Sequence, residues 1–164
     1  MTASTRHWTR TVTITRPANA TQYTANDGVS TTAGAILTFA GVATHAGGGG
    51  MIDTLYIHKT DQDTTSAAFR LHLFDTTVAV AGFNDGATMA VTDAEWQTGV
   101  GGIAIPQASW LNVVTGNVIT LDDIGLTYAC ASGDTNLYGF VAAEDTYTPA
   151  SAEVITIRLS GHVN

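Results

Sequence analysis

The hexapeptide Phe69-Arg70-Leu71-His72-Leu73-Phe74 alternates apolar and polar side chains with a period of two. This period is typical of a β-strand with one face in a hydrophobic core and the other face in water. We therefore expect Phe69, Leu71 and Leu73 to point inward, and Arg70 and His72 to point outward. No segment of the chain shows a sustained helical period.

Short apolar segments of the same kind occur along the whole chain. They cover residues 12–14, 35–39, 51–59, 103–105, 118–121, 126–130, 137–143 and 154–159, with turn-forming residues between them. A turn at residues 132–135 is expected to join the segments 126–130 and 137–143 as a hairpin. One helical turn is expected at residues 92–96, where Thr92 can act as an N-cap and Glu95 follows three residues later.

About eight short strands with turn signals between them predict an all-β fold. We expect a single-domain antiparallel β-sandwich of the jelly-roll type. Residues 1–10 are assigned to an N-terminal arm, because Arg10 has the same parity as the apolar Val12 and Ile14. Residues 11–164 are assigned to the sandwich domain.

Charged residues make up 12% of the chain, which is about half the usual share. Either part of the surface is buried by self-association, or the surface is coated with threonine. The formal net charge is −8, and the basic residues are one lysine and five arginines. Without a basic cluster, direct binding to nucleic acid or to an anionic membrane is not expected.

The ends and the single cysteine add two expectations. The first residues lack the apolar run of a secretory signal, and no segment has the length of a membrane span, so a soluble protein made in a host cytoplasm is expected. Cys130 lies in a predicted strand without a cationic neighbour, which favours a buried thiol that acts as a small hydrophobic side chain.

Motifs that carry chemistry are weak in this sequence. Gly47–Gly50 precede a predicted strand and lack the following Lys-Ser/Thr of a phosphate-binding loop. His58 and His72 could meet as metal ligands if their strands were paired, although exposed histidines are the simpler interpretation. Paired carboxylates of the glycosidase kind are not constrained by sequence. We expect no enzyme activity, no cofactor and no metal site.

Arginine and tryptophan near the N-terminus are the best candidates for a contact with a partner. Arg6, His7, Trp8 and Arg10 lie together, and both residue types are enriched in the energetically important part of interfaces. Trp8 could equally complete the core. Two further tryptophans, Trp96 and Trp110, are weaker candidates for a capsid or subunit interface.

Residues 16–30, RPANATQYTANDGVS, combine turn residues with one aromatic side chain. Pro17 is expected to end the first strand, since proline cannot donate a hydrogen bond to a central ladder. Tyr23 is expected to pin an extended crossing segment to the body of the protein. Asn26, Asp27 and Gly28 are then expected to turn the chain into the next strand.

Several segments together resemble small virion structural proteins of tailed bacteriophages. They are Arg16-Pro17-Ala18 with Thr21 and Tyr23, Gly28-Val29-Ser30, Leu37-Thr38-Phe39, Gly48-Gly49-Gly50, the hexapeptide 69–74, residues 130–139, and Tyr147-Thr148-Pro149-Ala150. Their order and spacing agree with the family over residues 10 to 160.

This resemblance implies a capsid decoration, or cement, protein. Such a protein would form jelly-roll homotrimers on the outer surface of the virion, bind the major capsid protein and stabilise contacts between its subunits. An alternative is a tail- or fibre-associated β-sandwich that binds glycans of the host surface, and a sugar-active enzyme is a third.

Overall fold

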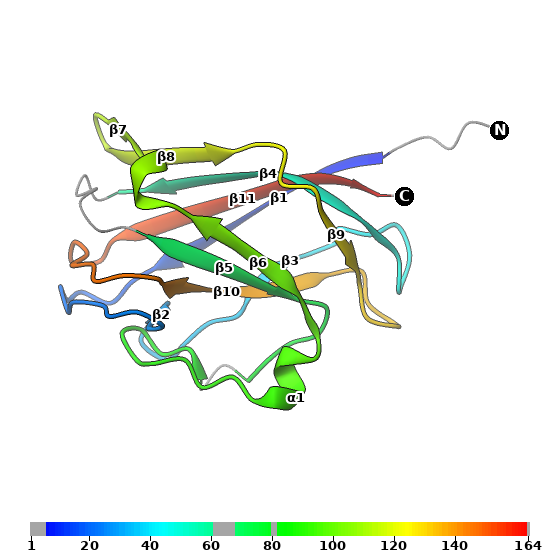
Figure 1. The fold of residues 1–164 in the computed structure, drawn as a ribbon, viewed down its shortest axis with the longest axis horizontal. Coiled ribbons are helices and arrows are strands. Elements are labelled where there is room, and N and C mark those ends of the chain that lie inside the picture. The colour runs from blue at the N-terminus through cyan, green and yellow to red at the C-terminus, as the bar shows by residue number, and fades with distance from the viewer. Residues whose placement is uncertain (1–5, 61–67, 80–81, 164) are drawn as a thin grey trace.

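The computed structural model describes residues 6–60, 68–79 and 82–163, which are almost entirely β-structure (Figure 1). The strands are β1 (Arg6–Thr15), β2 (Gly28–Val29), β3 (Leu37–Phe39), β4 (Gly49–Lys59), β5 (Phe69–Phe74), β6 (Gly99–Ile105), β7 (Leu111–Val113), β8 (Gly116–Leu121), β9 (Leu126–Ala129), β10 (Leu137–Ala143) and β11 (Val154–Val163). The helical elements are α1 (Asp93–Trp96) and the 3-10 helix η2 (Gln107–Ser109).

The strands form two antiparallel sheets that pack face to face (Figure 1). One sheet has the order β1-β11-β4-β8-β7, and the other has the order β2-β10-β5-β6. β9 continues the position of β8 along β4, and β3 shares a position with β2 along β10. Counted in this way, the strands fill the eight positions of a jelly roll, with β7 as an added edge. The predicted fold class is confirmed.

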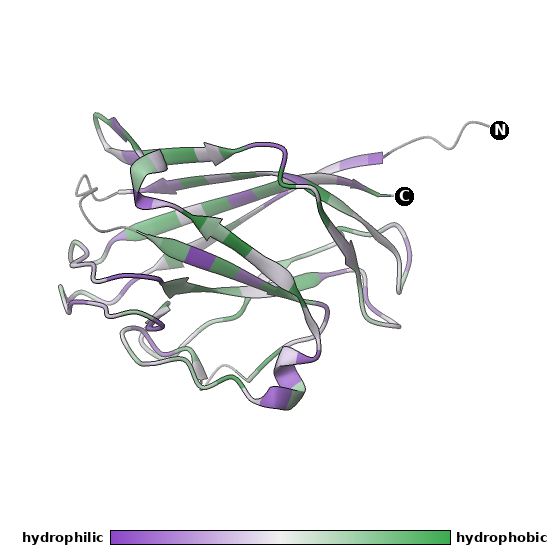
Figure 2. Ribbon diagram, viewed as in Figure 1, coloured by the Kyte–Doolittle hydropathy of each residue, from purple (hydrophilic) through white to green (hydrophobic). Residues whose placement is uncertain are grey.

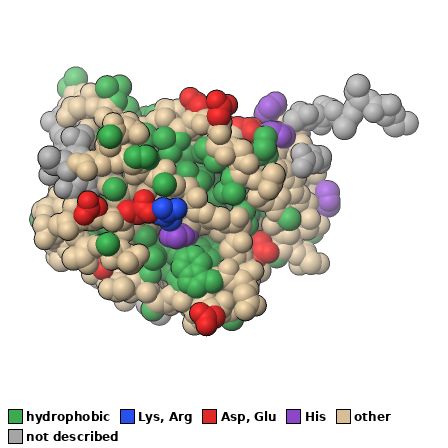
Figure 3. All heavy atoms as spheres, in the orientation of Figure 1, with side chains coloured by type: hydrophobic (Ala, Val, Ile, Leu, Met, Phe, Trp, Pro, Cys, Tyr) green, Lys and Arg blue, Asp and Glu red, His purple; other side chains and the backbone are tan. Residues whose placement is uncertain are grey.

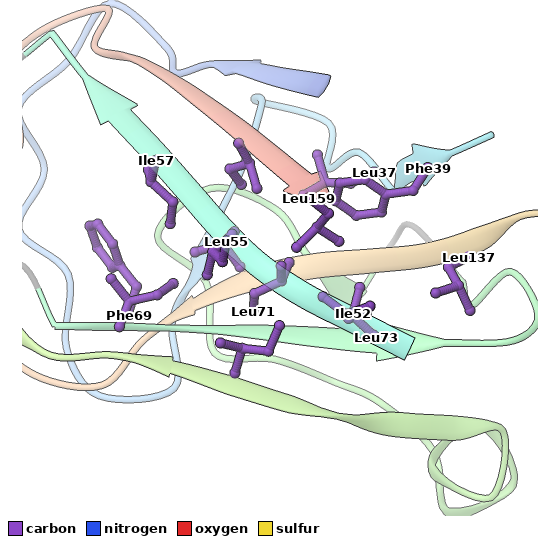
Figure 4. Close-up of a cluster of buried hydrophobic side chains, with 14 of the residues drawn as sticks. Leu37, Phe39, Ile52, Leu55, Ile57, Phe69, Leu71, Leu73, Leu137 and Leu159 are labelled. Atoms are coloured by element: carbon purple, nitrogen blue, oxygen red, sulfur yellow. The ribbon is translucent and has the colours of Figure 1, made fainter. Parts of the chain in front are cut away.

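The core lies between the two sheets, and β5 shows why. Phe69, Leu71 and Leu73 are fully buried, while the two polar residues between them are only partly covered. Figure 4 shows these three side chains among residues of the opposite sheet, including Leu55 and Ile57 of β4. Figure 2 shows hydrophobic residues interrupted by hydrophilic ones along the strands. Each fully buried side chain of this size contributes about 1.5–3 kcal/mol of burial free energy.

The inward alternation of β4 ends at a charged residue. Lys59, the one lysine of the chain, is fully buried at the end of this strand. Its Nζ donates to the hydroxyl of Tyr147 over 2.8 Å and lies 3.5 Å from Oε1 of Glu153. The Tyr147 hydroxyl also donates to the Glu153 carboxylate over 2.8 Å. A buried cation is tolerated here because its charge and hydrogen-bonding groups have partners.

A second buried ion pair holds the segment that follows β1. The Arg16 guanidinium donates to the Asp85 carboxylate over 2.9 Å, and the two side chains are almost inaccessible to solvent. The hydroxyl of Tyr23 donates to the same carboxylate over 2.5 Å. Burial, and then this hydrogen bond, raise the pKa of Tyr23 far above its usual value. The ring of Tyr23 stacks on that of Tyr147, which joins the two buried pairs.

The other two residues singled out in this segment lie at its ends. Pro17 follows β1, and its carbonyl accepts hydrogen bonds from the backbone of Asn19 and Ala152. Gly28 begins β2, where a Cβ would lie 3.2 Å from the carbonyl oxygen of Asn84. Asn26 has a φ of 72°, the left-handed conformation of a turn residue.

The first strand starts earlier than the arm assignment allowed. Residues 6–10 of the expected arm belong to β1 and pair with β11, and residues 1–5 lie outside the described residues. Arg10 points toward the sandwich but lies at its edge, where its guanidinium donates to the carbonyls of Ala40 and Gly41. Because these carbonyls accept its hydrogen bonds, the charged Arg10 can face the same side of β1 as Trp8, Val12 and Ile14.

One expected pairing between neighbouring segments is wrong, and one considered for a metal site does not occur. β9 and β10 do not form a hairpin, because β9 pairs with β4 in one sheet and β10 pairs with β5 in the other. The turn between them crosses from sheet to sheet. His58 on β4 and His72 on β5 are likewise in different sheets and cannot meet across a ladder.

The expected helical turn is confirmed. Thr92 is the N-cap of α1, and its side chain accepts from the backbone N–H of Glu95. The Glu95 carboxylate accepts in return from the backbone N–H of Thr92 over 2.8 Å. This reciprocal bonding is the capping box that the sequence predicts.

The buried Arg16–Asp85 pair makes a test of this core possible. Replacing Arg16 by Met should lower the free energy of unfolding by about 3–5 kcal/mol, because the Asp85 carboxylate would stay buried without its cation. The same change at Arg158, which is exposed and stacks on Tyr56, should cost less than about 1 kcal/mol. Urea unfolding of both variants measures the difference, and equal losses would contradict this assignment.

Candidate interaction surfaces

The four N-terminal candidates separate into exposed and buried residues. Arg6 and His7 are exposed on β1, and the His7 ring meets that of His162 edge to face at 6.0 Å. Trp8 is only 6% exposed, and its ring contacts the Tyr128 ring at 5.9 Å in a nearly perpendicular arrangement. Of the two roles considered for Trp8, the core role is the one that its burial supports.

The outer face of the larger sheet is coated with hydroxyl side chains. On β1 this face carries Thr9, Thr11, Thr13 and Thr15, and on β11 it carries Thr156, Arg158, Ser160 and His162. The hydroxyls of Thr9 and Ser160 are 3.1 Å apart and hydrogen-bonded. A sheet face covered in this way is polar with few charges, among them Arg158 on β11 and Asp53 beside His162. Threonine coating therefore accounts for part of the low charge without any partner.

The hairpin of β7 and β8 exposes the largest aliphatic side chains at one edge of the sandwich. Leu111 is 65% exposed and Val114, at the tip, is 93% exposed. Trp110 precedes them and is half-buried, with its ring edge to face with Phe69 at 6.2 Å. β7 is the last strand in the order of its sheet among the described residues. Exposed apolar groups on an edge strand favour association.

A second exposed aromatic surface lies on the outer face of the smaller sheet. Trp96 ends α1 and is 42% exposed. Its ring lies 5.2 Å from that of His72 and 5.6 Å from that of Phe74. Phe140 packs under the same cluster, 4.9 Å from the His72 ring in a stacked arrangement. Figure 3 shows hydrophobic, basic, acidic and histidine side chains gathered together on the face that carries β5 and β6.

The polar side of this surface is an ion pair. Arg70 and Glu144 meet at 2.5 Å, and each side chain is about one-third exposed. The nearby imidazole of His72 is desolvated. Burial, followed by the positive charge of Arg70, lowers the pKa of His72 to about 4, while Glu144 opposes the shift. His72 is therefore neutral near pH 7.

A pocket of about 410 Å³ lies between β6 and β9. Asp75 and Gln97 line it with residues 98–100 and 127–129. One carboxylate oxygen of Asp75 is inaccessible to solvent and makes no hydrogen bond to the described residues. Cys130 is buried close to this region, and burial, followed by the charges of Asp134 and Asp75, raises its pKa to about 11. This environment agrees with the predicted inert thiol.

The described residues include no cluster of metal ligands and no membrane-spanning helix. Across residues 6–60, 68–79 and 82–163, no three His, Cys, Asp or Glu side chains are grouped so that they could share a metal ion. No helix within the same ranges has the length and hydropathy needed to cross a bilayer.

No protein-family model and no curated protein sequence matches the chain. Solved structures do resemble it. The cyanophage Pam1 capsid asymmetric unit shares 13% identity at a TM-score of 0.39, covering 100% of this chain and 89% of that one. The native virion of Kashmir bee virus at acidic pH shares 11% at 0.40, covering 97% and 71%. Turnip yellow mosaic virus shares 12% at 0.29, covering 97% and 94%.

Sequence reasoning identified Trp96 and Trp110 but missed the side chains around them. No strand was expected at residues 111–114, where β7 and the tip of its hairpin expose Leu111 and Val114. Arg70 and Glu144 are 74 positions apart and meet because β5 pairs with β10. No local signal predicts that contact.

The lowered pKa of His72 predicts a pH dependence of stability. An unfolded histidine has a pKa near 6.5, so the unfolded chain binds this proton more tightly than the folded chain does. Stability from a neutral His72 is complete above pH 6.5 and is lost as the pH falls toward 4. The loss should be about 1–3 kcal/mol, because His72 is only partly buried.

Replacing His72 by Phe should remove this loss, since Phe keeps the ring contacts and cannot be protonated. Urea unfolding at about pH 7 and pH 4.5 should show the variant gaining on the wild type at the lower pH. An equal fall in both proteins would refute the shifted pKa.

Proposed function

We propose that this chain is a virion structural protein that decorates the outer surface of a tailed-phage head. In this role it binds the major capsid protein as a homotrimer and stabilises contacts between capsid subunits. The observation that supports it best is where the residues of the family resemblance lie. The hexapeptide 69–74 forms the centre of the core, and Arg16, Tyr23 and Tyr147 form the buried polar framework of a jelly roll.

Such a protein stabilises a shell by mass action. It binds the assembled lattice and not the separated subunits, so every occupied site shifts the equilibrium toward the intact shell. Symmetric association also multiplies the number of contacts, because a trimer presents the same surface three times.

The hairpin of β7 and β8 is the proposed association surface. Burial of a leucine or valine side chain contributes about 1.5–3 kcal/mol, and each of the three copies would contribute both. Leu111 and Val114 present exposed apolar side chains on the β7–β8 hairpin, against which a neighbouring copy can pack.

A charge on this hairpin should break the trimer. Leu111→Glu should turn a particle of three times 17.0 kDa into a monomer with the same circular dichroism spectrum, because a carboxylate would have to be buried. Thr13→Glu, on the exposed face of β1 at the far edge of the sheet, adds the same charge and should leave the trimer intact. Light scattering measures both.

A wild-type chain that is monomeric at micromolar concentration would reject the homotrimer. A Leu111→Glu variant that remains trimeric would reject the hairpin as its interface.

Binding to the head is tested separately, by sedimentation with expanded shells of the cognate major capsid protein. Deletion of residues 1–10 is unsuitable, because it would remove Trp8 from the core and half of β1. Replacing the exposed Arg6 and His7 by Ala leaves β1 whole, and we expect it to weaken sedimentation with shells, because these two residues are the exposed N-terminal candidates for a capsid contact. Wild-type protein that stays in the supernatant would reject the decoration role.

A further inference from the structure

The outer face of the smaller sheet contains a groove that the decoration role does not use. Its volume is about 280 Å³, and Arg70, His72 and Trp96 provide most of its side-chain walls. Its floor is the glycine-rich start of β6, where Gly99, Gly101 and Gly102 line it. The volume is close to the lower end of the range for small-molecule sites.

The glycines of β6 keep the groove open. Gly102 is paired with His72 across the β5–β6 ladder, so a side chain there would stand on the same face. A Cβ on Gly102 would lie 3.2 Å from Cδ of Arg70 and 3.6 Å from Nδ1 of His72. Any larger side chain would therefore fill the space between the walls.

Trp96 offers an aromatic platform at one end. Its nearest described rings meet it at large angles, 70° for His72 and 41° for Phe74, so no described ring stacks parallel to it. The α1 capping box fixes the short helix that carries it. The indole is therefore held in place while a large part of it stays in contact with water.

The charge of Arg70, the polar wall of the groove, is balanced by its ion pair with Glu144. Both short contacts of Arg70 are to the same carboxylate oxygen of Glu144, at 2.5 and 2.6 Å. Glu144 itself does not line the groove, and further N–H groups of the Arg70 guanidinium remain for a ligand, since they have no bond to another described residue. Because the pair is neutral overall and His72 is uncharged near pH 7, the groove offers donors and acceptors without net charge.

We infer that this groove binds a neutral pyranose sugar, one ring at a time. The apolar C–H face of a pyranose can stack on the indole of Trp96, and its hydroxyls can accept from Arg70 and exchange hydrogen bonds with the neutral imidazole of His72. An anionic sugar fits less well, since the charge of Arg70 is already neutralised by Glu144 and the chain carries a net charge of −8. A protein partner needs about 800 Å² of contact, far more than this groove presents. The inference does not rest on the proposed decoration role.

The test uses the full chain and a panel of glucose, galactose, mannose, N-acetylglucosamine and their short oligosaccharides, with glucuronic acid as the anionic arm. Saturation-transfer NMR detects binding, and quenching of tryptophan fluorescence by iodide measures protection of Trp96. We expect at least one neutral sugar to bind and to reduce quenching, because Trp8 is buried and Trp110 half-buried.

Trp96→Ala should weaken that binding about tenfold or more, which corresponds to about 1.4 kcal/mol of lost stacking. Glu144→Gln keeps the shape of the side chain but removes the charge that holds Arg70 in place from outside the groove, so it should weaken binding about threefold or more. Thr13→Ala, on the exposed face of β1 in the other sheet, is the control and should bind as the wild type does.

The inference is overturned if no neutral sugar of the panel binds, or if Trp96→Ala and Glu144→Gln both bind as tightly as the control. It is also overturned if glucuronic acid binds more tightly than every neutral sugar, since that would identify an anion site. Capture of a protein ligand by the same groove in the absence of sugar binding would likewise reject it.

Discussion

The stacking of Tyr23 on Tyr147 is the contact on which the rest of this sandwich depends. Each ring ends in a hydroxyl that serves a buried ion pair, Arg16 with Asp85 on one side and Lys59 with Glu153 on the other. The backbones of the two tyrosines also pair as an isolated bridge. Because a buried charge is costly without a partner, the crossing segment can settle in few positions other than this one. The stack thereby fixes how the chain passes from one sheet to the other.

Much of this architecture could be predicted from local patterns. The alternation in β5 and in residues 155–159 gave the correct inward faces, and the capping box of α1 was visible as Thr92 and Glu95. Pairing between distant strands could not be predicted, since turn residues alone do not say whether a chain folds back or crosses to the other sheet. This is why the expected hairpin of β9 and β10 was wrong. Buried ion pairs were equally invisible, because Arg16 and Asp85 are 69 positions apart.

Exposure of side chains at the surface is equally hard to predict from the sequence. Scarce charge in the sequence had two explanations, and the hydroxyl-coated face of β1 and β11 supplies one of them. The exposed apolar side chains of Leu111 and Val114 are compatible with the other explanation, burial of surface by self-association. Both surfaces are compatible in one protein, since a sheet face can be soluble through threonine while its edge is apolar. Exposure of a particular side chain is decided by the neighbours that topology brings to it.

The burial of Lys59 has a practical side. It is the single lysine of the sequence, and its amine is enclosed by Tyr147, Glu153 and the ring of Trp110. Reagents that modify amines therefore find no lysine at the surface of the folded chain. The same burial makes the appearance of a reactive lysine a direct signal that the sandwich has opened.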